Sequence, residues 1–292
     1  MAKKEYVIHT IEELLDTIRE IKFASDSMER ALWFRGHADR DWDLIPSIQR
    51  DLAINSEEER MLTNEFRVRT SQVKPDAPDR EDYSSWMSLM QHYGLATRLL
   101  DWTKSPLIAL FFAVENAYTP DGKDACLWVL RPEVLNKHQI DSNKVFPIDS
   151  ITVEEMLRRA FKDPYRPSGR EDEEEWLRQE QWGIRGKDKI VACYSVEHDL
   201  RMYSQQACFT AHDTQLPLTE FAARYAEEFP EEPALLTKLL IPDNCKLQLI
   251  RDLKLLGITV SFVYPDMSHI SRDVWWDVIG KVKNADYHTK LK

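Results

Sequence analysis

One segment of the 292-residue chain restricts its fold more than any other. Ser105 followed by Pro106 is a typical helix start, because Ser caps a first turn and Pro is favoured at the first helical position. The eight residues that follow, Leu107 to Val114, are all apolar. A helix that is apolar on every side is normally buried in a large core. The sequence therefore predicts a central helix with other elements packed around it.

Residue patterns on both sides of this helix predict strands interspersed with further helices. Short apolar, β-branched and aromatic runs predict strands at 31–34, 125–130, 190–194, 235–241 and 258–264. Helical spacing predicts helices at 10–21, 56–72 and 86–93, capped by Thr10, Ser56 and Ser85, another that ends at Gly257, and a last one from about 268. Because the elements do not strictly alternate, we expect an α+β fold: a single large domain with a central mixed β-sheet flanked by helices.

Composition suggests how the chain is organised along its length. We expect an N-terminal helix within residues 1–29, a main domain at 30–270 and a C-terminal helix within 271–292. Inside the main domain, residues 151–189 carry an acidic run at 171–175 and several arginines. So many charges do not build a core, and we expect this segment to be a solvated helical insert beside or over the site.

Charge and cysteine usage disfavour several classes of protein. A net charge of −11 and a pI near 5.3 disfavour non-specific binding to nucleic acid, which needs a basic face, although a local basic pocket is compatible with them. No stretch approaches the roughly 18 consecutive apolar residues of a membrane span, so we expect a cytoplasmic protein with no membrane partner. The four cysteines are far apart and form no CxxC pair, so we expect reduced thiols and no metal site.

The first candidate site is the triplet Phe34-Arg35-Gly36, at the expected end of a strand. An Arg in this position can clamp a phosphate or a carboxylate, and the Gly beside it lets a ligand or another chain approach the backbone closely. An equally valid interpretation is structural. The Arg would then pair with a buried Asp and tie the sheet to a loop.

The second candidate is the polar segment from Gln91 to Thr103. His92 could act as a general acid or base, and Asp101 could hold Arg98 or Arg35 in a fixed orientation. The alternative is a buried hydrogen-bond network that joins two helices.

A third polar cluster lies late in the chain, just after a predicted strand: Arg201, Gln205, Gln206, Phe209 and Thr210. Its amides suit a planar polar ligand, although a surface Gln taken singly usually has no such role. The sequence contains no GxSxG, GxxxxGK, GxGxxG or HExxH motif. Common hydrolase, kinase, dinucleotide-fold and zinc-protease interpretations therefore lose support.

Together these motifs resemble the FRG domain family. The resemblance rests on Phe34-Arg35-Gly36, Trp42 to Pro46, Gln91 to Gly94, Thr97 to Trp102 and Pro106 to Ala113. Later in the chain Arg201, Gln205 and Phe209 resemble the family's Arg and Gln-x-Gly-x-Phe pattern, so that the likeness covers about residues 30 to 270. Ala96 stands where the family commonly has Pro, and Ala207 where it commonly has Gly. The family is named for a motif and not for a reaction, so membership alone does not assign one.

A second resemblance, confined to the first motif, suggests a reaction. The aromatic-Arg-Gly triplet that ends in Gly36 is similar to the first motif of ADP-ribosyltransferases, in which the Arg contacts the NAD diphosphate. This likeness implies an ADP-ribosyltransferase-like form of the fold and NAD as a substrate. His92 and Tyr93 would then face the nicotinamide ribose. No residue of the chain is assigned to the catalytic Glu that such enzymes often place on a late strand.

These inferences give nine residues a candidate role. The candidate catalytic residues are His92, Tyr93, Asp101 and Gln205. The candidate ligand-binding residues are Arg35, Gly36, Arg98, Arg201 and Phe209. We expect five of them to converge on one cleft: Arg35, His92, Arg98, Asp101 and Gln205.

Three functions remain open at this point. The first is an NAD-consuming or ADP-ribosyl-transferring enzyme that acts as a toxin or phage-defence effector, with an unidentified macromolecular acceptor. The second is a nucleotide- or nucleic-acid-processing enzyme that uses the same polar residues. The third is a module that binds a small anionic signal without turning it over.

Overall fold

The computed structural model of the chain describes residues 5–24, 31–50, 54–119, 121–162, 189–195, 200–275 and 278. Its centre is one eight-stranded sheet, in the order β1-β8-β4-β2-β3-β7-β6-β5. The strands are β1 (Tyr6–Val7), β2 (Trp33–His37), β3 (Leu99–Thr103), β4 (Ala125–Leu130), β5 (Phe146–Pro147), β6 (Ile190–Tyr194), β7 (Ala207–His212) and β8 (Leu236–Ile241). The sheet is mixed, because β1 runs parallel to β8 and β5 parallel to β6, whereas the other neighbours are antiparallel. A central mixed sheet flanked by helices confirms the expected fold class.

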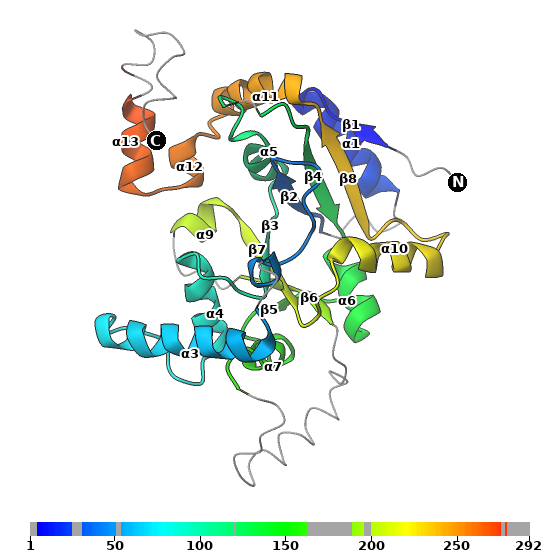
Figure 1. The fold of residues 1–292 in the computed structure, drawn as a ribbon. Helices are drawn as coiled ribbons and strands as arrows, with labels where there is room; N and C mark the ends of the chain where they lie inside the picture. Colours follow the sequence, from blue (N-terminus) through cyan, green and yellow to red (C-terminus); the bar gives the residue numbers. More distant parts are fainter. Residues whose placement is uncertain are drawn as a thin grey trace.

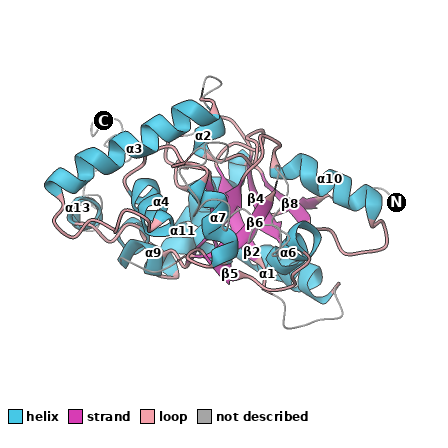
Figure 2. Ribbon diagram, turned by 90° about the horizontal axis from the view of Figure 1, so that it is seen from below, coloured by secondary structure: helices cyan, strands magenta, loops and turns pink. Residues whose placement is uncertain are grey.

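Helices flank the sheet along its whole width (Figures 1 and 2). Before β4 they are α1 (Ile11–Phe23), α2 (Ser47–Arg50), α3 (Ser56–Val73), α4 (Tyr83–His92) and α5 (Pro106–Val114). After β4 they are α6 (Pro132–Ile140), α7 (Ile151–Arg158), α9 (Leu200–Ser204), α10 (Leu218–Glu228), α11 (Asp243–Leu255), α12 (Val260–Val263) and α13 (Met267–Trp275). None of the helices in the described ranges is both long and apolar enough to cross a membrane.

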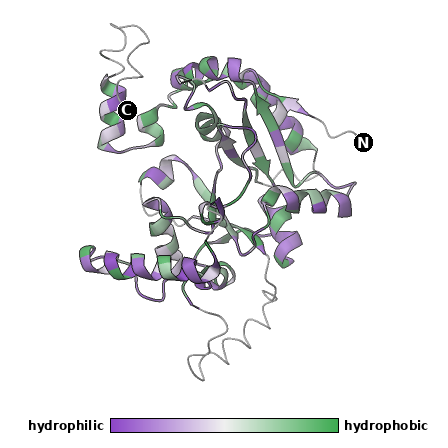
Figure 3. Ribbon diagram, in the orientation of Figure 1, coloured by the Kyte–Doolittle hydropathy of each residue, from purple (hydrophilic) through white to green (hydrophobic). Residues whose placement is uncertain are grey.

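The strand register divides the core into two faces. On one face α1, α5 and α11 pack on the half of the sheet that contains β8, β4 and β2, and α4 and α7 pack on the half that contains β3, β7 and β6. The other face carries Trp33, Trp102 and Trp128 and is covered by parts of α6 and α10. In Figure 3 the sheet strands are largely hydrophobic in colour, whereas α3 is hydrophilic along most of its length.

The predicted central helix is confirmed as α5. Ser105 caps it by accepting a hydrogen bond from the Ile108 main-chain N–H, and Pro106 occupies its first turn. The helix packs directly on β2 at Gly36. A Cβ atom added there would lie 1.9 Å from the Ala109 carbonyl oxygen and 2.6 Å from the Ala113 nitrogen. Gly36 therefore gives room to the backbone of a helix of the same domain, and its expected part in ligand binding stays a prediction.

Several expected element boundaries were wrong for identifiable reasons. Helix α3 is capped by Asn55 in a capping box with Glu58, not by Ser56 with Glu59, and α4 is capped by Asp82, not Ser85. Residues 258–264, expected to form a strand, instead contain the short helix α12, because Thr259 caps it by accepting from the Phe262 main-chain N–H. Short apolar runs do not distinguish a strand from a buried helical turn.

The segment expected to be a charged insert begins inside the core. Helix α7 buries Val153, Met156 and Leu157 among residues of α4, β6 and β7, and Phe161 just after it is also buried. The expectation of a solvated insert was therefore wrong for residues 151–162. These charges flank an amphipathic pattern that the composition alone concealed. Residues 163–188, which include the acidic run, lie outside the described residues.

Candidate functional site

Arg35 lies in the middle of β2, not at its end as expected, because the strand continues to His37. Its register partner on β4 is Trp128, whose own partner on β8 is Lys238. Directly paired residues of neighbouring strands project from the same face of a sheet. Lys238, Trp128 and Arg35 therefore form a row on one sheet face, and the Lys238 ammonium lies 5.0 Å from the Trp128 ring centroid.

The Arg35 guanidinium occupies the place where β2 and β3 part. The two strands pair at Phe34 and Thr103. Beyond this pair Arg35 Nη1 donates to the Asp101 main-chain oxygen at 2.6 Å and lies 3.8 Å from Asp101 Oδ2. Arg35 Nε donates to His37 Nε2 at 3.0 Å. We call this region, made up of Arg35, His37 and Asp101, the β2–β3 fork.

The Asp101 carboxylate is held by α4. Gln91 Nε2 donates to both carboxylate oxygens at 2.9 Å, and Gln91 Oε1 accepts from the Thr97 hydroxyl. The Asp101 side chain nevertheless remains 54% exposed, whereas that of Arg35 is 16% exposed. Of the two arginines that Asp101 was expected to orient, Arg35 is the one that lies near it, bonded to the Asp101 main-chain oxygen and 3.8 Å from the carboxylate. Gln91 belongs to the predicted polar segment, but it had no assigned role.

The positive charges near the fork exceed the negative charge that Asp101 supplies. Burial lowers the pKa of Arg35 to about 10; the Asp101 charge opposes this fall, and the nearby Arg50 charge adds to it. Burial, followed by the Arg35 and Arg50 charges, lowers the pKa of His37 to about 3. His37 is therefore neutral at physiological pH and accepts the Arg35 Nε–H through Nε2. Neither His37 nor Arg50 was identified from the sequence, because neither belongs to a recognisable motif.

The same sheet face holds buried N–H groups without acceptors. Trp33 Nε1, Trp128 Nε1 and His212 Nδ1 are buried and have no hydrogen-bond partner among the described residues. Trp102 Nε1 donates to the Thr210 hydroxyl, which contacts His212 Nε2 at 2.9 Å. If the Thr210 hydroxyl donates onward to His212 Nε2, the imidazole proton is on Nδ1. Indole and imidazole N–H groups without acceptors make this face more favourable for an anion.

Arg98 is placed very differently from Arg35, although both were expected to bind a ligand. It lies just before β3 and is buried. Its guanidinium donates to Glu59 at 2.9 and 2.6 Å, to Asp213 at 3.0 Å and to the Met156 carbonyl at 3.1 Å. Burial opposes its charge, but the Glu59 and Asp213 carboxylates outweigh burial and raise the pKa of Arg98. Arg159 also pairs with Asp213, so Arg98 joins α3, α7 and β7 and has no geometry for a ligand.

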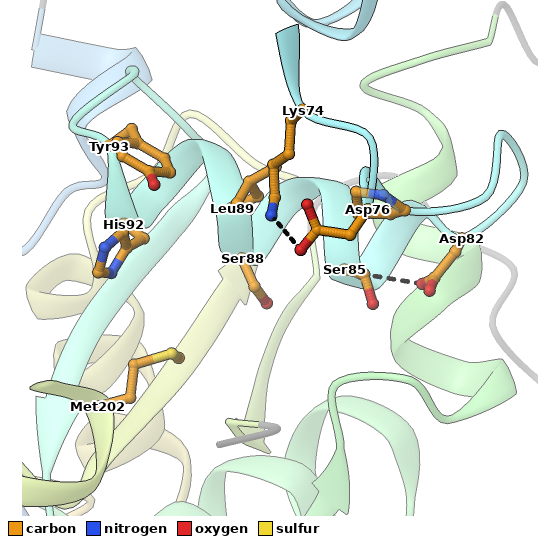
Figure 4. Close-up of a pocket in the computed structure, with 10 residues that line it drawn as sticks. Lys74, Asp76, Asp82, Ser85, Ser88, Leu89, His92, Tyr93 and Met202 are labelled. Atoms are coloured by element: carbon orange, nitrogen blue, oxygen red, sulfur yellow. Dashed lines mark hydrogen bonds and ion pairs between the residues drawn. The ribbon is translucent and has the colours of Figure 1, made fainter. Parts of the chain in front are cut away.

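His92 and Tyr93 lie at a separate pocket of about 440 Å³, formed by α4, the segment after α3 and Met202 of α9 (Figure 4). Their rings contact each other at 4.9 Å between centroids. No hydrogen bond in the described part of the chain links either of them to Arg35 or Asp101. Gln91 and His92 are adjacent in sequence but project about 100° apart around a helix, so Gln91 reaches the fork and His92 does not.

The late polar cluster does not join the fork either. Gln205 donates to the Val263 carbonyl, and its own carbonyl accepts from the Thr103 hydroxyl. The exposed Arg201 lies over the Tyr264 ring at 5.1 Å. Phe209 is buried in the core beneath α4 and α7, as a residue of β7 that the sequence did not predict as a strand. Of the five residues expected in one cleft, the structure brings together Arg35 and Asp101.

The arrangement at the fork suits recognition of an anion. Arg35 supplies a partly exposed guanidinium, Arg50 a second positive charge, and Asp101 an acceptor for a hydroxyl group. Across the residues that the structure describes, no three His, Cys, Asp or Glu side chains are placed to hold a metal ion.

Comparison with known proteins supports the first resemblance. Residues 30–122 match the family model of the FRG domain, so the resemblance is supported over this part of the chain. The match includes Arg35, Gly36, His92, Arg98 and Asp101 and ends before the late polar cluster. The chain matches no curated protein and no solved structure.

Proposed function

We propose that this chain binds a small anionic nucleotide at the β2–β3 fork, and that this nucleotide is NAD. The observation that carries the proposal is the incomplete neutralisation of Arg35. Among the described residues its carboxylate neighbour is Asp101, which is 3.8 Å away and half exposed, and Arg50 adds a like charge. A phosphate that accepts from Arg35 would supply the missing negative charge, and such charge-assisted bonds are roughly twice as strong as neutral ones.

Other groups at the fork fit the remaining parts of a nucleotide. Trp42 is 54% exposed and its indole lies 5.9 Å from the His37 ring, so it offers a surface on which a base can stack. The Asp101 carboxylate, fixed by Gln91, can accept hydrogen bonds from ribose hydroxyl groups. NAD is preferred among nucleotides because the Phe34-Arg35-Gly36 triplet is similar to the diphosphate-binding motif of ADP-ribosyltransferases.

If NAD is turned over, the step that fits these residues is cleavage of the nicotinamide N-glycosidic bond. The bond between ribose C1′ and the ring nitrogen breaks, its electron pair stays on nicotinamide, and positive charge develops on the ribose. A hydroxyl oxygen of water or of an acceptor then bonds to C1′ and loses its proton to a carboxylate. Asp101 is the candidate for stabilising the charge and taking the proton. Action as a toxin or phage-defence effector stays a prediction.

A binding module without turnover is the second candidate. It is favoured because the Asp101 carboxylate is bonded to the Gln91 amide, and no base or nucleophile in the described ranges is hydrogen-bonded to that carboxylate. Nucleotide or nucleic-acid processing draws on the same Arg35 clamp and differs from NAD cleavage in its substrate.

The test combines binding and product assays on the full chain. Melting temperature and isothermal titration are measured with NAD, ADP-ribose and inorganic pyrophosphate, while nicotinamide release and cleavage of an RNA oligonucleotide are followed separately. Arg35→Ala is compared with Arg224→Ala, which removes an exposed Arg paired with Glu220 far from the fork in sequence.

We expect NAD to raise the melting temperature of the parent and of Arg224→Ala, and Arg35→Ala to bind at least tenfold more weakly, about 1.4 kcal/mol. Release of nicotinamide supports an enzyme, and binding without release supports the module. Cleavage of RNA without NAD binding supports a nucleic-acid-processing enzyme. An unchanged NAD affinity in Arg35→Ala would show that the fork is not the site.

A further inference from the structure

The pocket beside α4 is a second place where the domain can hold a ligand. Its lining comes from Lys74 and Asp76 after α3, from Ser88, Leu89 and His92 on the following helix α4, and from Met202 on α9, which lies much later in the sequence. A volume of about 440 Å³ lies within the range of roughly 300 to 1,000 Å³ that is typical of small-molecule sites. The β2–β3 fork contributes no residue to this lining, so the pocket is a separate feature.

One face of α4 supplies most of the wall. Ser85, Ser88, Leu89 and His92 are spaced at i, i+3, i+4 and i+7, which places them on one side of a helix. Figure 4 shows the Ser85 and Ser88 side chains extending from the same side of α4. The pocket is therefore built on a regular element, which fixes its shape better than a loop would.

Ser88 indicates that something is missing from this wall. The residue is 4% exposed, and its hydroxyl has no hydrogen-bond partner among the described residues. A buried hydroxyl without a partner costs roughly 1 to 3 kcal/mol, and Ala would fit the same helix position without that cost. Neighbouring Ser84, by contrast, donates to Asp82. The orphaned hydroxyl is explained if a bound molecule completes its hydrogen bonding.

The lining also indicates the chemistry of that molecule. Leu89 and Met202 form apolar walls, and the Tyr93 ring stands at the rim, 68% exposed, where a planar ring can stack. Lys74 is already paired with Asp76 at 2.7 Å, so it offers no unpaired charge for a phosphate. The Ser88 hydroxyl can both donate and accept, which matches the hydroxyl and amide groups of a ribose or a base.

We propose that the α4 pocket, defined by Lys74, Asp76, Ser88, Leu89, His92 and Met202, binds an uncharged nucleoside or nucleobase. The planar base lies against Leu89 and Met202, and one polar group of the ligand bonds to Ser88. This site is independent of the anionic nucleotide proposed for the fork.

The test is direct binding of an uncharged panel: adenosine, guanosine, cytidine, uridine and nicotinamide, each up to about 5 mM, measured by ligand-observed NMR and by melting temperature. Three variants are compared with the parent. Ser88→Ala removes the unpaired hydroxyl, Leu89→Trp fills the pocket, and Arg35→Ala alters only the fork. Because Ser88→Ala removes an unsatisfied group, it should fold at least as stably as the parent.

We expect at least one member of the panel to bind the parent and Arg35→Ala equally. Ser88→Ala should weaken that binding by fivefold or more, and Leu89→Trp should abolish it. Failure of every panel member to bind the parent overturns the proposal. Binding that survives both Ser88→Ala and Leu89→Trp also overturns it, and binding lost only in Arg35→Ala would assign the ligand to the fork. Because Arg35→Ala distinguishes the two sites, failure of the α4 pocket proposal does not affect the proposal that the fork binds NAD.

Discussion

Arg35 lies in β2, and Arg98 lies 63 positions later, directly before the neighbouring strand β3. Both belong to motifs that suggest a ligand, yet the charges around the two guanidinium groups are opposite in effect. Arg98 meets two carboxylates and a carbonyl, and its pKa is raised. Arg35 meets a carbonyl, a distant carboxylate and a second cation, and its pKa is lowered to about 10. The difference lies in the partners: those of Arg98 neutralise its buried charge, whereas those of Arg35 do so incompletely.

The largest effect should come from Arg98→Ala. It leaves Glu59 without its partner and Asp213 with Arg159 alone, so we expect a loss of roughly 3 to 5 kcal/mol in the free energy of unfolding, measured by urea denaturation. The double variant Arg98→Met with Glu59→Met, which removes the buried pair together, should lose less than Arg98→Ala. If Arg98→Ala were as stable as the parent, the contrast between the two arginines would fail.

The next effect is a loss of stability in mild acid. His37 and His212 have pKa values near 3 in the folded protein, against about 6.5 when unfolded, chiefly because they are buried. The unfolded chain therefore binds more protons below pH 6.5, so stability that is full above that pH falls as the pH decreases toward 3. Between pH 7 and 5.5 we expect a loss of roughly 2 kcal/mol from the two groups together.

The variant that checks this assignment is His212→Gln, measured by urea denaturation across the same pH range, which stays above most carboxyl titration. His212 is one of the two histidines with a pKa near 3, so its removal should make the pH dependence about half as steep. An unchanged slope would mean that other groups cause the loss.

Arg35→Ala should change stability by only about 1 kcal/mol or less, because burial already disfavours the Arg35 charge and its carboxylate neighbour lies 3.8 Å away and is 54% exposed. Urea denaturation of this variant beside Arg98→Ala measures the contrast directly. A loss comparable with that of Arg98→Ala would make Arg35 a structural residue as well, and weaker NAD binding by the variant would then reflect unfolding.

The smallest effect is expected for Arg201→Ala. Arg201 is exposed and contacts the Tyr264 ring, so we expect a loss of roughly 0.5 to 1 kcal/mol and no change in NAD affinity. Titration with NAD and a urea curve check both parts. A change in NAD affinity like that of Arg35→Ala would return the late polar cluster to the ligand site.

The fold was more predictable than the site because local patterns suffice for much of it. Residues 106–114 could form little but a buried helix, and residues 125–130 little but a buried strand. Strand β7 was not predicted because it contains small and polar residues, and because it directly follows the polar residues Arg201, Gln205 and Gln206. Local composition identifies elements well when one face or all faces are apolar.

At the site, sequence reasoning linked Asp101 to an Arg but could not choose between Arg35 and Arg98. The partners of Arg98 are Glu59 and Asp213, which lie 39 and 115 positions away, and no local pattern marks them. Glu59 even suggested a different role, as the end of a capping box. Gln91 belongs to the predicted polar segment, but its hydrogen bond to Asp101 depends on how α4 packs on the sheet, which the sequence does not reveal.

The pairing of β1 with β8 has a consequence for how the protein forms during synthesis. Tyr6 pairs with Leu239, and β8 separates β1 from the rest of the sheet. Strand β1 therefore cannot pair until some 230 further residues have been synthesised. Contacts so distant in sequence slow folding and leave strand edges exposed meanwhile. The antiparallel strands β2, β3 and β4 can pair much earlier, so the β2–β3 fork should assemble on the nascent chain well before β1 joins the sheet.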